Sequence, residues 1–217
     1  MDLRFAPGLK LMSHKQFTDY FDNRSIYPIG VEISPSGRCN AKCPDCLYRQ
    51  DNNKLSGLDK DLFDEDRMYV LIQELVALGV KSISWTGGGD PPMHPSFPQF
   101  VRWANEAGLN QGLFTNGLLP IKYDPSLIDW IRVTKTDKPI NEEVLISMRS
   151  CKTLGICLNY APDYDESIVK ELLDIVERLD AIRTLPEHST YLQIRPLLHI
   201  GGKVNYGRKA PKITHRQ

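Results

Sequence analysis

The amino-acid sequence predicts an α/β fold in which six short parallel strands alternate with helices. Runs rich in apolar and β-branched residues, each about six residues long or shorter, predict the strands. Segments with apolar residues at helical spacing separate these runs and predict the helices. Glycine-rich and polar motifs follow the strands, at the rim where parallel α/β folds place their chemistry. Because strands joined by helices form right-handed βαβ units, we expect a single parallel sheet.

The first strand and the first helix have clear local signals. The run 29–33 alternates apolar and polar residues and ends at a Pro-Ser-Gly turn, so it predicts a strand. Asp64 is expected to cap the following helix, and Gly79 suits the left-handed position just beyond its end. Five apolar residues at helical spacing are expected to face the core: Met68, Leu71, Ile72, Leu75 and Val76.

The remaining elements continue this alternation. Strands are expected at 81–85, 112–114, 130–133, 155–158 and 191–197. Helices are expected at 96–107, at 141–149 with Asn141 as N-cap, and over a longer segment from about 165. Their apolar faces comprise Phe97, Phe100, Val101 and Ala104 in the first, Val144, Leu145 and Met148 in the second, and Ile168, Leu172, Ile175, Val176 and Leu179 in the third.

We expect one domain, residues 29–200, between a short N-terminal extension (1–28) and a basic C-terminal tail (201–217). The tail contains five basic residues and no acid, which leaves 22 basic against 27 acidic residues in 1–200. Such a segment is typical of a solvated terminus, with phosphate contact as the alternative. The formal net charge of zero does not indicate nucleic acid as a partner.

The composition also bears on the compartment. No stretch approaches the roughly 20 apolar residues of a membrane span, and the first residues lack the apolar core of a secretion signal. Five cysteines, an odd number with three clustered, indicate ligation chemistry in a reducing compartment rather than a disulfide framework. We therefore expect a cytoplasmic protein with no membrane partner.

Cys39, Cys43 and Cys46 form a C-x3-C-x2-C motif directly after the first predicted strand. Thiolates are soft ligands that select iron–sulfur clusters, zinc or Cu(I). Zinc sites more often combine two Cys or Cys/His pairs, and the sequence has no second pair, so the spacing favours iron–sulfur over a zinc site completed by a distant histidine. A [4Fe-4S] cluster held by three cysteines leaves one iron free to bind a small molecule.

Two further motifs end the next two strands. Gly87, Gly88, Gly89 and Asp90 follow the second, and the Thr-Asn-Gly run 115–117 follows the third. The glycines are expected to expose their backbone at close range and to adopt positive φ, although a Gly-Pro run alone is also typical of an ordinary turn. In this order, at the ends of successive strands, the three motifs resemble the radical S-adenosylmethionine (radical SAM) superfamily over about residues 29–197.

The resemblance implies a (β/α)6 partial TIM barrel, a [4Fe-4S] cluster on Cys39, Cys43 and Cys46, and S-adenosylmethionine chelating the unique iron. It implies reductive cleavage of S-adenosylmethionine to a 5′-deoxyadenosyl radical, which abstracts hydrogen from a substrate. The small size of the chain favours a small metabolite or nucleotide-like molecule as this unidentified substrate. An external electron donor such as flavodoxin or ferredoxin is also implied.

The resemblance also implies which residues bind S-adenosylmethionine. The run Gly87, Gly88, Gly89 and Asp90 corresponds to the segment that hydrogen-bonds its ammonium group, although family members usually have Glu where this chain has Asp90. Asn116 lies near the same ligand. Thr134 and Lys135 end the fourth strand, where the family often binds the ribose or carboxylate.

The substrate side of the predicted site is less well defined, and no catalytic side chain is assigned. Arg195 suits either a carboxylate or phosphate ligand or an ion pair at the barrel rim. Cys157 could donate a hydrogen atom, but a cysteine in mid-strand is far more often a small buried apolar residue. Family members usually carry an aromatic residue where this chain has Asp45, and Leu47 or Tyr48 is the expected substitute.

Three alternative functions stay open on the sequence. Within the family, a peptide- or protein-modifying enzyme or an activase would use the same radical chemistry. Outside it, a non-catalytic iron–sulfur scaffold or electron carrier would hold a cluster indifferent to S-adenosylmethionine. A zinc-stabilised binding module would hold zinc without sulfide.

Overall fold

The computed structural model describes residues 27–43, 46, 48, 61–136, 138–160, 166–183, 185 and 187–196. The expected N-terminal extension, apart from residues 27 and 28, and the whole basic tail lie outside these residues. Asp45 and Leu47 also lie outside them. The predicted limits of the domain therefore stay predictions.

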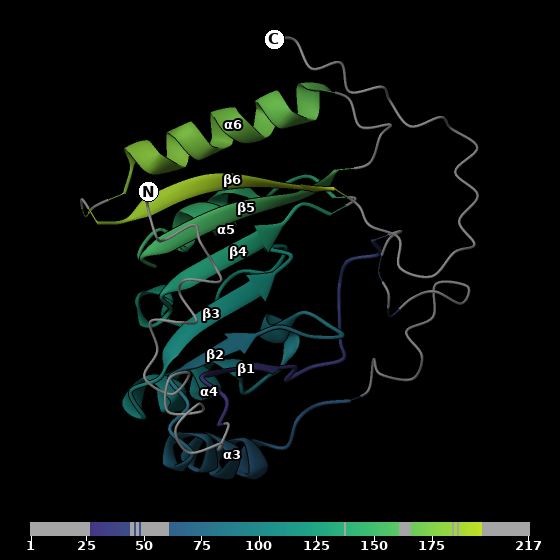
Figure 1. Ribbon diagram of the computed structural model, residues 1–217. Helices are drawn as coiled ribbons and strands as arrows, with labels where there is room; N and C mark the ends of the chain where they lie inside the picture. The colour runs from purple at the N-terminus through teal and green to yellow at the C-terminus, as the bar shows by residue number, and fades with distance from the viewer. Residues whose placement is uncertain are drawn as a thin grey trace.

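Six strands form one parallel sheet in the order β1-β2-β3-β4-β5-β6. Because β1 and β6 stand at opposite ends of this order, the sheet is open, as the predicted (β/α)6 partial barrel requires (Figure 1). The strands are β1 (Gly30–Ile33), β2 (Ser82–Trp85), β3 (Asn110–Thr115), β4 (Trp130–Thr134), β5 (Thr153–Tyr160) and β6 (Ser189–Pro196). The α/β class and the parallel arrangement are confirmed.

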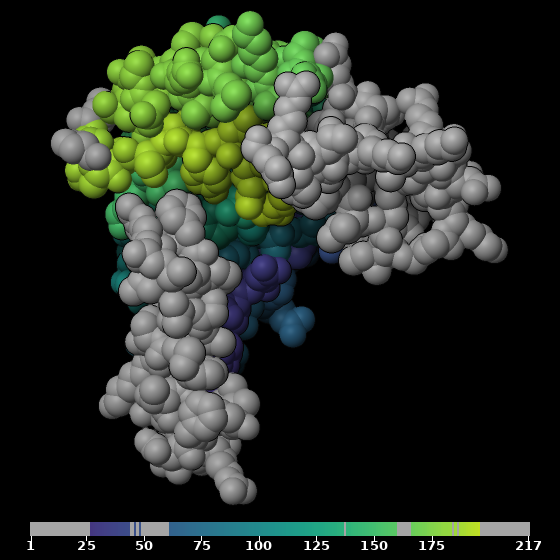
Figure 2. All heavy atoms as spheres, turned by 45° about the horizontal axis from the view of Figure 1, so that its top comes forward, coloured from purple at the N-terminus to yellow at the C-terminus, as the bar shows by residue number. Residues whose placement is uncertain are grey.

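Helices connect the strands in the predicted alternation. The α-helices are α3 (Glu65–Ala77), α4 (Phe97–Glu106), α5 (Glu142–Ser147) and α6 (Glu166–Ala181), and two short 3₁₀ helices are η4 (Pro91–Met93) and η5 (Pro125–Leu127). Figures 1 and 2 show α6 lying along β6 at one end of the sheet, whereas α3 lies near β1 at the other end in Figure 1. None of the described helices has the length and apolar character that a membrane crossing demands.

The predicted helix caps are present. The Asp64 side chain accepts a hydrogen bond from the backbone of Arg67 at 3.0 Å, and Asn141 accepts one from Val144 at 3.3 Å. These bonds satisfy backbone N–H groups of the first helical turn that have no partner within the helix. Gly79 has φ 82°, which is the left-handed conformation expected just beyond the end of α3.

The predicted core face of α3 was one residue too wide. Met68, Ile72 and Leu75 are buried, whereas Val76 is 39% exposed. At about 100° per residue, Val76 lies about 80° around the helix axis from Met68, so it reaches the edge of the buried stripe. Sequence spacing alone could not determine how wide that stripe is.

Several strands are longer than predicted. β5 and β6 each have eight residues, and all eight positions pair in register from Thr153 with Ser189 to Tyr160 with Pro196. Polar residues such as Asn159 do not show the apolar pattern that predicts a strand. Their backbone N–H and C=O groups nevertheless form hydrogen bonds with the neighbouring strand. The expectation of strands of six residues or fewer was therefore wrong for these two.

The two faces of the sheet have different roles. Alternate strand residues, among them Ile83, Leu113, Ile131 and Ile156, belong to a buried core shared with the helices. The residues between them point to the opposite face, because side chains alternate along a strand. This second face, called the concave face below, includes Phe114, Arg132, Thr134, Cys157 and Asn159 from β3, β4 and β5. It leads to the cavity at the carboxyl ends of the strands.

Candidate active site

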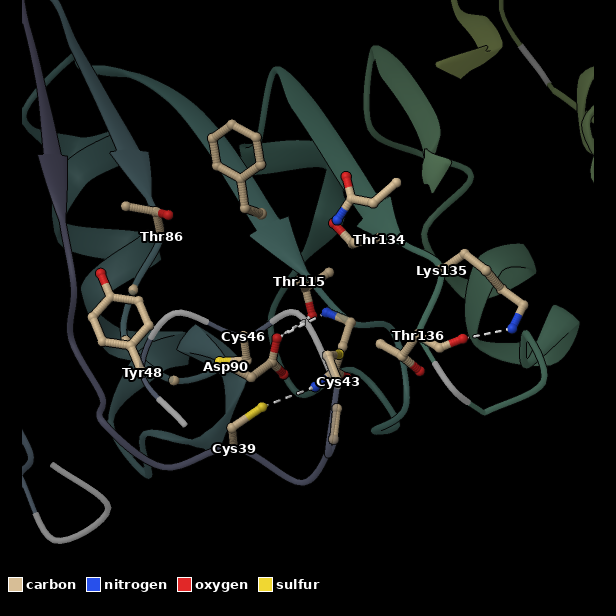
Figure 3. A pocket seen from close by; sticks show the side chains of 17 residues that line it. Cys39, Cys43, Cys46, Tyr48, Thr86, Asp90, Thr115, Thr134, Lys135 and Thr136 are labelled. Atoms are coloured by element: carbon tan, nitrogen blue, oxygen red, sulfur yellow. Dashed lines mark hydrogen bonds between the residues drawn. The ribbon is translucent and has the colours of Figure 1, made fainter. Parts of the chain in front are cut away.

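A cavity of about 330 Å³ lies at the carboxyl ends of β2 to β5. Its wall combines the cysteine segment after β1 with residues at the ends of the other strands (Figure 3). The lining residues are Cys39, Ala41, Cys43, Cys46, Tyr48, Thr86, Gly87, Gly88, Gly89, Asp90, Phe114, Thr115, Asn116, Thr134, Lys135, Thr136 and Asn159. Every cofactor-binding and metal-ligating residue predicted from the sequence therefore lies at this one cavity.

The stem of the cysteine segment, residues 35–38, is held by backbone hydrogen bonds on two sides. On one side, Gly37 N donates to Asp61 O at 2.8 Å and Phe63 N donates to Pro35 O at 2.9 Å. On the other side, the residues that follow β2 donate to it, with Gly89 N to Ser36 O at 3.0 Å and Asp90 N to Arg38 O at 2.7 Å. Cys39 follows this stem directly, so its backbone starts from a well-defined position.

Gly87 and Gly89 allow a close approach, as expected from the sequence, but no glycine of the run has the expected positive φ. The described glycines with positive φ are Gly79, Gly108 and Gly117, and none belongs to the run. A Cβ atom on Gly89 would lie 2.2 Å from the carbonyl oxygen of Arg38. A Cβ atom on Gly87 would lie 2.6 Å from Ser34 Oγ. The Gly89 contact is with backbone atoms and leaves no room for a side chain beside the cysteine segment, whereas the Gly87 contact is with a hydroxyl that can rotate.

Asp90 is a buried carboxylate at the cavity, with an exposed fraction of only 3%. Its Oδ1 atom accepts hydrogen bonds from Thr115 Oγ1 at 2.8 Å and from Asn116 N at 2.9 Å. Its Oδ2 atom is buried and has no partner among the described residues. Burial raises the pKa of Asp90 to about 6, a larger effect than the lowering by these two hydrogen bonds. One oxygen thus fixes the carboxylate, and the other is enclosed by protein without a hydrogen-bond partner among the described residues.

Asn116 connects the end of β3 to the cysteine segment. Its Nδ2 atom lies 2.7 Å from Asn40 Oδ1 and 3.7 Å from Cys39 Sγ, and donates to both. Its Oδ1 atom accepts a hydrogen bond from Leu118 N at 2.9 Å, which orients the amide. Lys138 Nζ donates to Asn40 O at 3.0 Å from the other side. Asn116 therefore contacts the first cysteine directly, as well as lining the cavity.

The three cysteines of the motif line the same cavity, and Figure 3 shows Cys39, Cys43 and Cys46 grouped with Asp90. All five cysteines of the chain are described, and none of them forms a disulfide. Within the described residues, no three His, Cys, Asp or Glu side chains converge closely enough to hold a metal ion. The thiols thus share the wall of a cavity without meeting at one point.

Thr134 and Lys135 line the cavity from the end of β4, as predicted, but their side chains differ in orientation. Lys135 Nζ donates to the carbonyl oxygens of Thr136 at 2.6 Å and Lys138 at 2.8 Å. Figure 3 shows this ammonium group turned away from the cysteines. Thr134 is half-buried on the concave face of β4.

Sequence reasoning missed several residues that position the site. Thr115 donates to Asp90, and Ser34 Oγ accepts a hydrogen bond from Gly88 N at 3.1 Å. Thr115 belonged to a recognised motif, so its position at a strand end was an available signal. Ser34 carried no such signal, because serine is a common turn residue in many contexts.

Comparisons with known proteins show what this chain is similar to. No protein-family model matches the chain. GTP 3′,8-cyclase of Chlorobaculum tepidum is 33% identical over 104 residues, which are 47% of this chain and 29% of that protein. The tungsten-containing aldehyde ferredoxin oxidoreductase cofactor-modifying protein of Pyrococcus furiosus is 31% identical over 84 residues, 39% of this chain and 22% of that protein. Each match therefore spans less than a third of the curated relative.

A solved structure, hexahistidine-tagged anSMEcpe with bound AdoMet, has the same fold with a TM-score of 0.57 at 16% sequence identity. The likeness covers 82% of this chain and 55% of that one. The sequence matches and this shared partial-barrel fold confirm the resemblance to the radical SAM superfamily that the three motifs predicted.

Proposed function

We propose that this chain is a radical SAM enzyme domain that holds a [4Fe-4S] cluster on Cys39, Cys43 and Cys46 and binds S-adenosylmethionine in the adjoining cavity. One observation carries the proposal. The three cysteines share a cavity with the glycine run and with a buried carboxylate, Asp90, whose Oδ2 atom has no partner among the described residues.

The residues present fit these two groups. Three thiols are a soft donor set suited to iron–sulfur ligation, and all three reach the cavity. A four-iron cluster is several ångströms across, so its ligands stand further apart than those of a single metal ion. Asp90 Oδ2 is buried without a partner among the described residues, which is costly, so a small movement of this cavity-lining side chain that lets Oδ2 accept from an ammonium group would be favourable. With a pKa of about 6, Asp90 is largely ionised at pH 7, which suits a cationic partner.

The other predicted residues position or contact the cluster and S-adenosylmethionine. The glycine run keeps the end of β2 against the cysteine segment, so the acceptor of the ammonium group and the thiols are positioned together. Asn116 orients Cys39 through its amide, and Thr134 offers a hydroxyl to the ribose or carboxylate. Lys135 would serve the carboxylate only after leaving the carbonyl groups it now binds. Tyr48, at the cavity wall, is available to pack against the adenine.

When bound, the cluster and S-adenosylmethionine supply a 5′-deoxyadenosyl radical that abstracts hydrogen from the substrate. The sequence match to a GTP cyclase supports a small metabolite or nucleotide-like substrate. Modification of a peptide or protein, or activation of another enzyme, is the second candidate within the family. The proposal includes an external electron donor such as flavodoxin or ferredoxin and a cytoplasmic location.

Anaerobic reconstitution followed by electron paramagnetic resonance (EPR) of the reduced protein tests the proposal. We expect the iron and sulfide content of a [4Fe-4S] cluster, an EPR signal that changes when S-adenosylmethionine is added, and formation of 5′-deoxyadenosine. Cys39→Ala should lose the cluster signal. Cys151→Ala removes a buried thiol outside the cavity and should retain it, so it is the matched control.

The alternatives outside the family have their own outcomes in this experiment, and a comparison of wild-type cells with cells carrying Cys39→Ala distinguishes the substrate classes. A cluster whose EPR signal is unchanged by S-adenosylmethionine, with no 5′-deoxyadenosine, would overturn the enzymatic proposal in favour of an electron carrier or scaffold. Zinc without sulfide would support a zinc-stabilised binding module. A shifted peptide mass, instead of a changed metabolite, in cells carrying Cys39→Ala would favour peptide modification.

A further inference from the structure

The concave face of the sheet carries two arginines beside the proposed cofactor cavity. Arg132 lies on β4, in register with Phe114 of β3 and Gly155 of β5. Arg195 lies on β6, in register with Asn159 of β5 and nearer the carboxyl rim. Phe114 and Asn159 both line the cavity. The two arginines thus occupy the same face of the sheet as the wall of the cavity.

Arg132 is held in place by three aromatic side chains. Its guanidinium carbon lies 5.1 Å from the ring centroid of Phe114 and 5.4 Å from that of Trp130. Its Nε atom donates a hydrogen bond to Tyr191 Oη at 3.1 Å. Aromatic faces attract a guanidinium group and leave its in-plane N–H donors available. Arg132 is therefore preorganised, and only its Nε donor is used by these contacts.

Two glycines make room for this arrangement. A Cβ atom on Gly155 would lie 2.4 Å from the ring of Tyr191, so this ring can cross β5 to reach Arg132 only because Gly155 has no side chain. A Cβ atom on Gly112 would lie 2.0 Å from the ring of Trp130. The chain thus uses two strand glycines to fit the aromatic residues that hold one arginine.

Arg195 approaches from the other side of Cys157. Its Nε atom donates a hydrogen bond to Gln193 Oε1 at 3.1 Å, and Gln193 is in register with Cys157. Burial raises the pKa of the Cys157 thiol, while the nearby charges of Arg195 and Arg132 oppose this shift. Arg132 and Arg195 lie on the two strands that border β5, so they flank Cys157 on the concave face.

Neither arginine has an acidic partner in the described part of the chain. The ion pairs found there are Lys152–Asp129 and Arg178–Glu142, on other surfaces. The outer nitrogens of Arg132 and Arg195 make no hydrogen bond to the described residues. Two guanidinium groups without an acidic partner among the described residues on one face create a positive potential there, which favours binding of an anion.

We propose that Arg132 and Arg195 bind a carboxylate or phosphate group of the substrate, which places the substrate against the concave face next to the cavity. This inference rests on the proposed function and names its substrate class. Planar guanidinium groups bind carboxylate and phosphate oxygens through paired hydrogen bonds, and the aromatic contacts of Arg132 reduce the entropy lost on binding. An anionic substrate would then lie beside Cys157 and within reach of chemistry at the cavity.

Inorganic phosphate is the probe for this site. Its binding to the reconstituted full chain, saturated with S-adenosylmethionine, is measured by ³¹P NMR titration. We expect saturable binding, weakened about tenfold or more in Arg132→Gln and in Arg195→Gln, because each loses charge-assisted hydrogen bonds. Arg132→Lys keeps the charge without the fork and should recover only part of the affinity. Arg102→Gln makes the same change in charge on the exposed face of α4 and should bind like the wild type.

The EPR response to S-adenosylmethionine, measured in the same variants, distinguishes two anions that the arginines could bind: a group of the substrate, or the carboxylate of S-adenosylmethionine. We expect this response to persist in both Gln variants. Its loss would assign the arginines to the carboxylate of S-adenosylmethionine and overturn the inference. Absence of saturable phosphate binding to the wild type, or binding equally strong in the Gln variants, would also overturn it. Absence of any cluster or EPR response in the wild type contradicts the proposed function instead, and the phosphate titration, repeated on the chain without cluster, still reports on the arginines.

Discussion

Gly89→Ala is expected to separate the cysteine segment from the end of β2. The added Cβ would lie 2.2 Å from Arg38 O, 2.5 Å from Gly37 C and 2.6 Å from Arg38 N. All three are backbone atoms, so no side chain can rotate away to relieve the contact. Since real Cβ contacts essentially never fall under 3.0 Å, the two segments must move apart by nearly 1 Å or more.

The size of the effect follows from the hydrogen bonds at this contact. Gly89 N donates to Ser36 O at 3.0 Å and Asp90 N donates to Arg38 O at 2.7 Å. A separation of about 1 Å takes both bonds beyond normal hydrogen-bond length. At about 0.5–1.5 kcal/mol for each bond, the free energy of unfolding should fall by about 1–3 kcal/mol.

Urea unfolding of the cluster-free chain measures this loss, and iron and sulfide content after reconstitution measures its effect on the cysteines. We expect Gly89→Ala to hold less cluster, because Cys39 directly follows the displaced residue Arg38. Gly30→Ala is the matched control, since its Cβ would meet the hydroxyl of Ser82 at 2.7 Å, which can rotate. Wild-type stability and cluster content in Gly89→Ala, or an equal loss in Gly30→Ala, would refute the reasoning.

Three further predictions concern other contacts of the site. The pKa of Asp90 rises from an ordinary 3.8 to about 6 on folding, so the folded state holds this proton more tightly than the unfolded state. The free energy of unfolding should therefore fall by about 2 kcal/mol as the pH rises from about 4 to 6. Asp90→Asn has no carboxyl group to titrate at this position. Its free energy of unfolding, measured by urea unfolding of the cluster-free chain, should therefore lack this pH-dependent fall. Asn116→Ala removes the amide donor to Cys39 and should make the cluster midpoint potential more negative by about 20–60 mV, measured by EPR-monitored redox titration. Gly155→Ala should displace the ring of Tyr191 and weaken phosphate binding severalfold in the ³¹P NMR titration.

Each of these predictions has a result that contradicts it. The same fall in stability with pH in Asp90→Asn and in the wild type would show that another group is responsible. An unchanged potential in Asn116→Ala would mean that its amide does not act on the cluster. Unchanged phosphate affinity in Gly155→Ala would mean that Tyr191 does not position Arg132.

Local sequence signals predicted the order of the elements. The caps Asp64 and Asn141 and the left-handed Gly79 depend on hydrogen bonds and backbone conformation within a few residues, so short stretches of sequence contain the information. The site was found for a related reason. In a parallel sheet all carboxyl ends meet at one rim, so motifs after successive strands had to converge on one cavity.

Contacts between strands were decided only by the tertiary structure. The sequence marked Gly89 as conformationally free, whereas its contact with Arg38 depends on how the cysteine segment packs against the end of β2. The hydrogen bond from Thr115 to Asp90 likewise joins residues 25 positions apart.

Arg132 carried no signal in the sequence, because it lies inside an apolar strand and two of its three aromatic partners come from β3 and β6. Sequence alone thus determined the element order, the cysteine motif and the rim where the site lies. The sheet register decided which side chains face each other there, because that register depends on pairing between distant segments that no local pattern specifies.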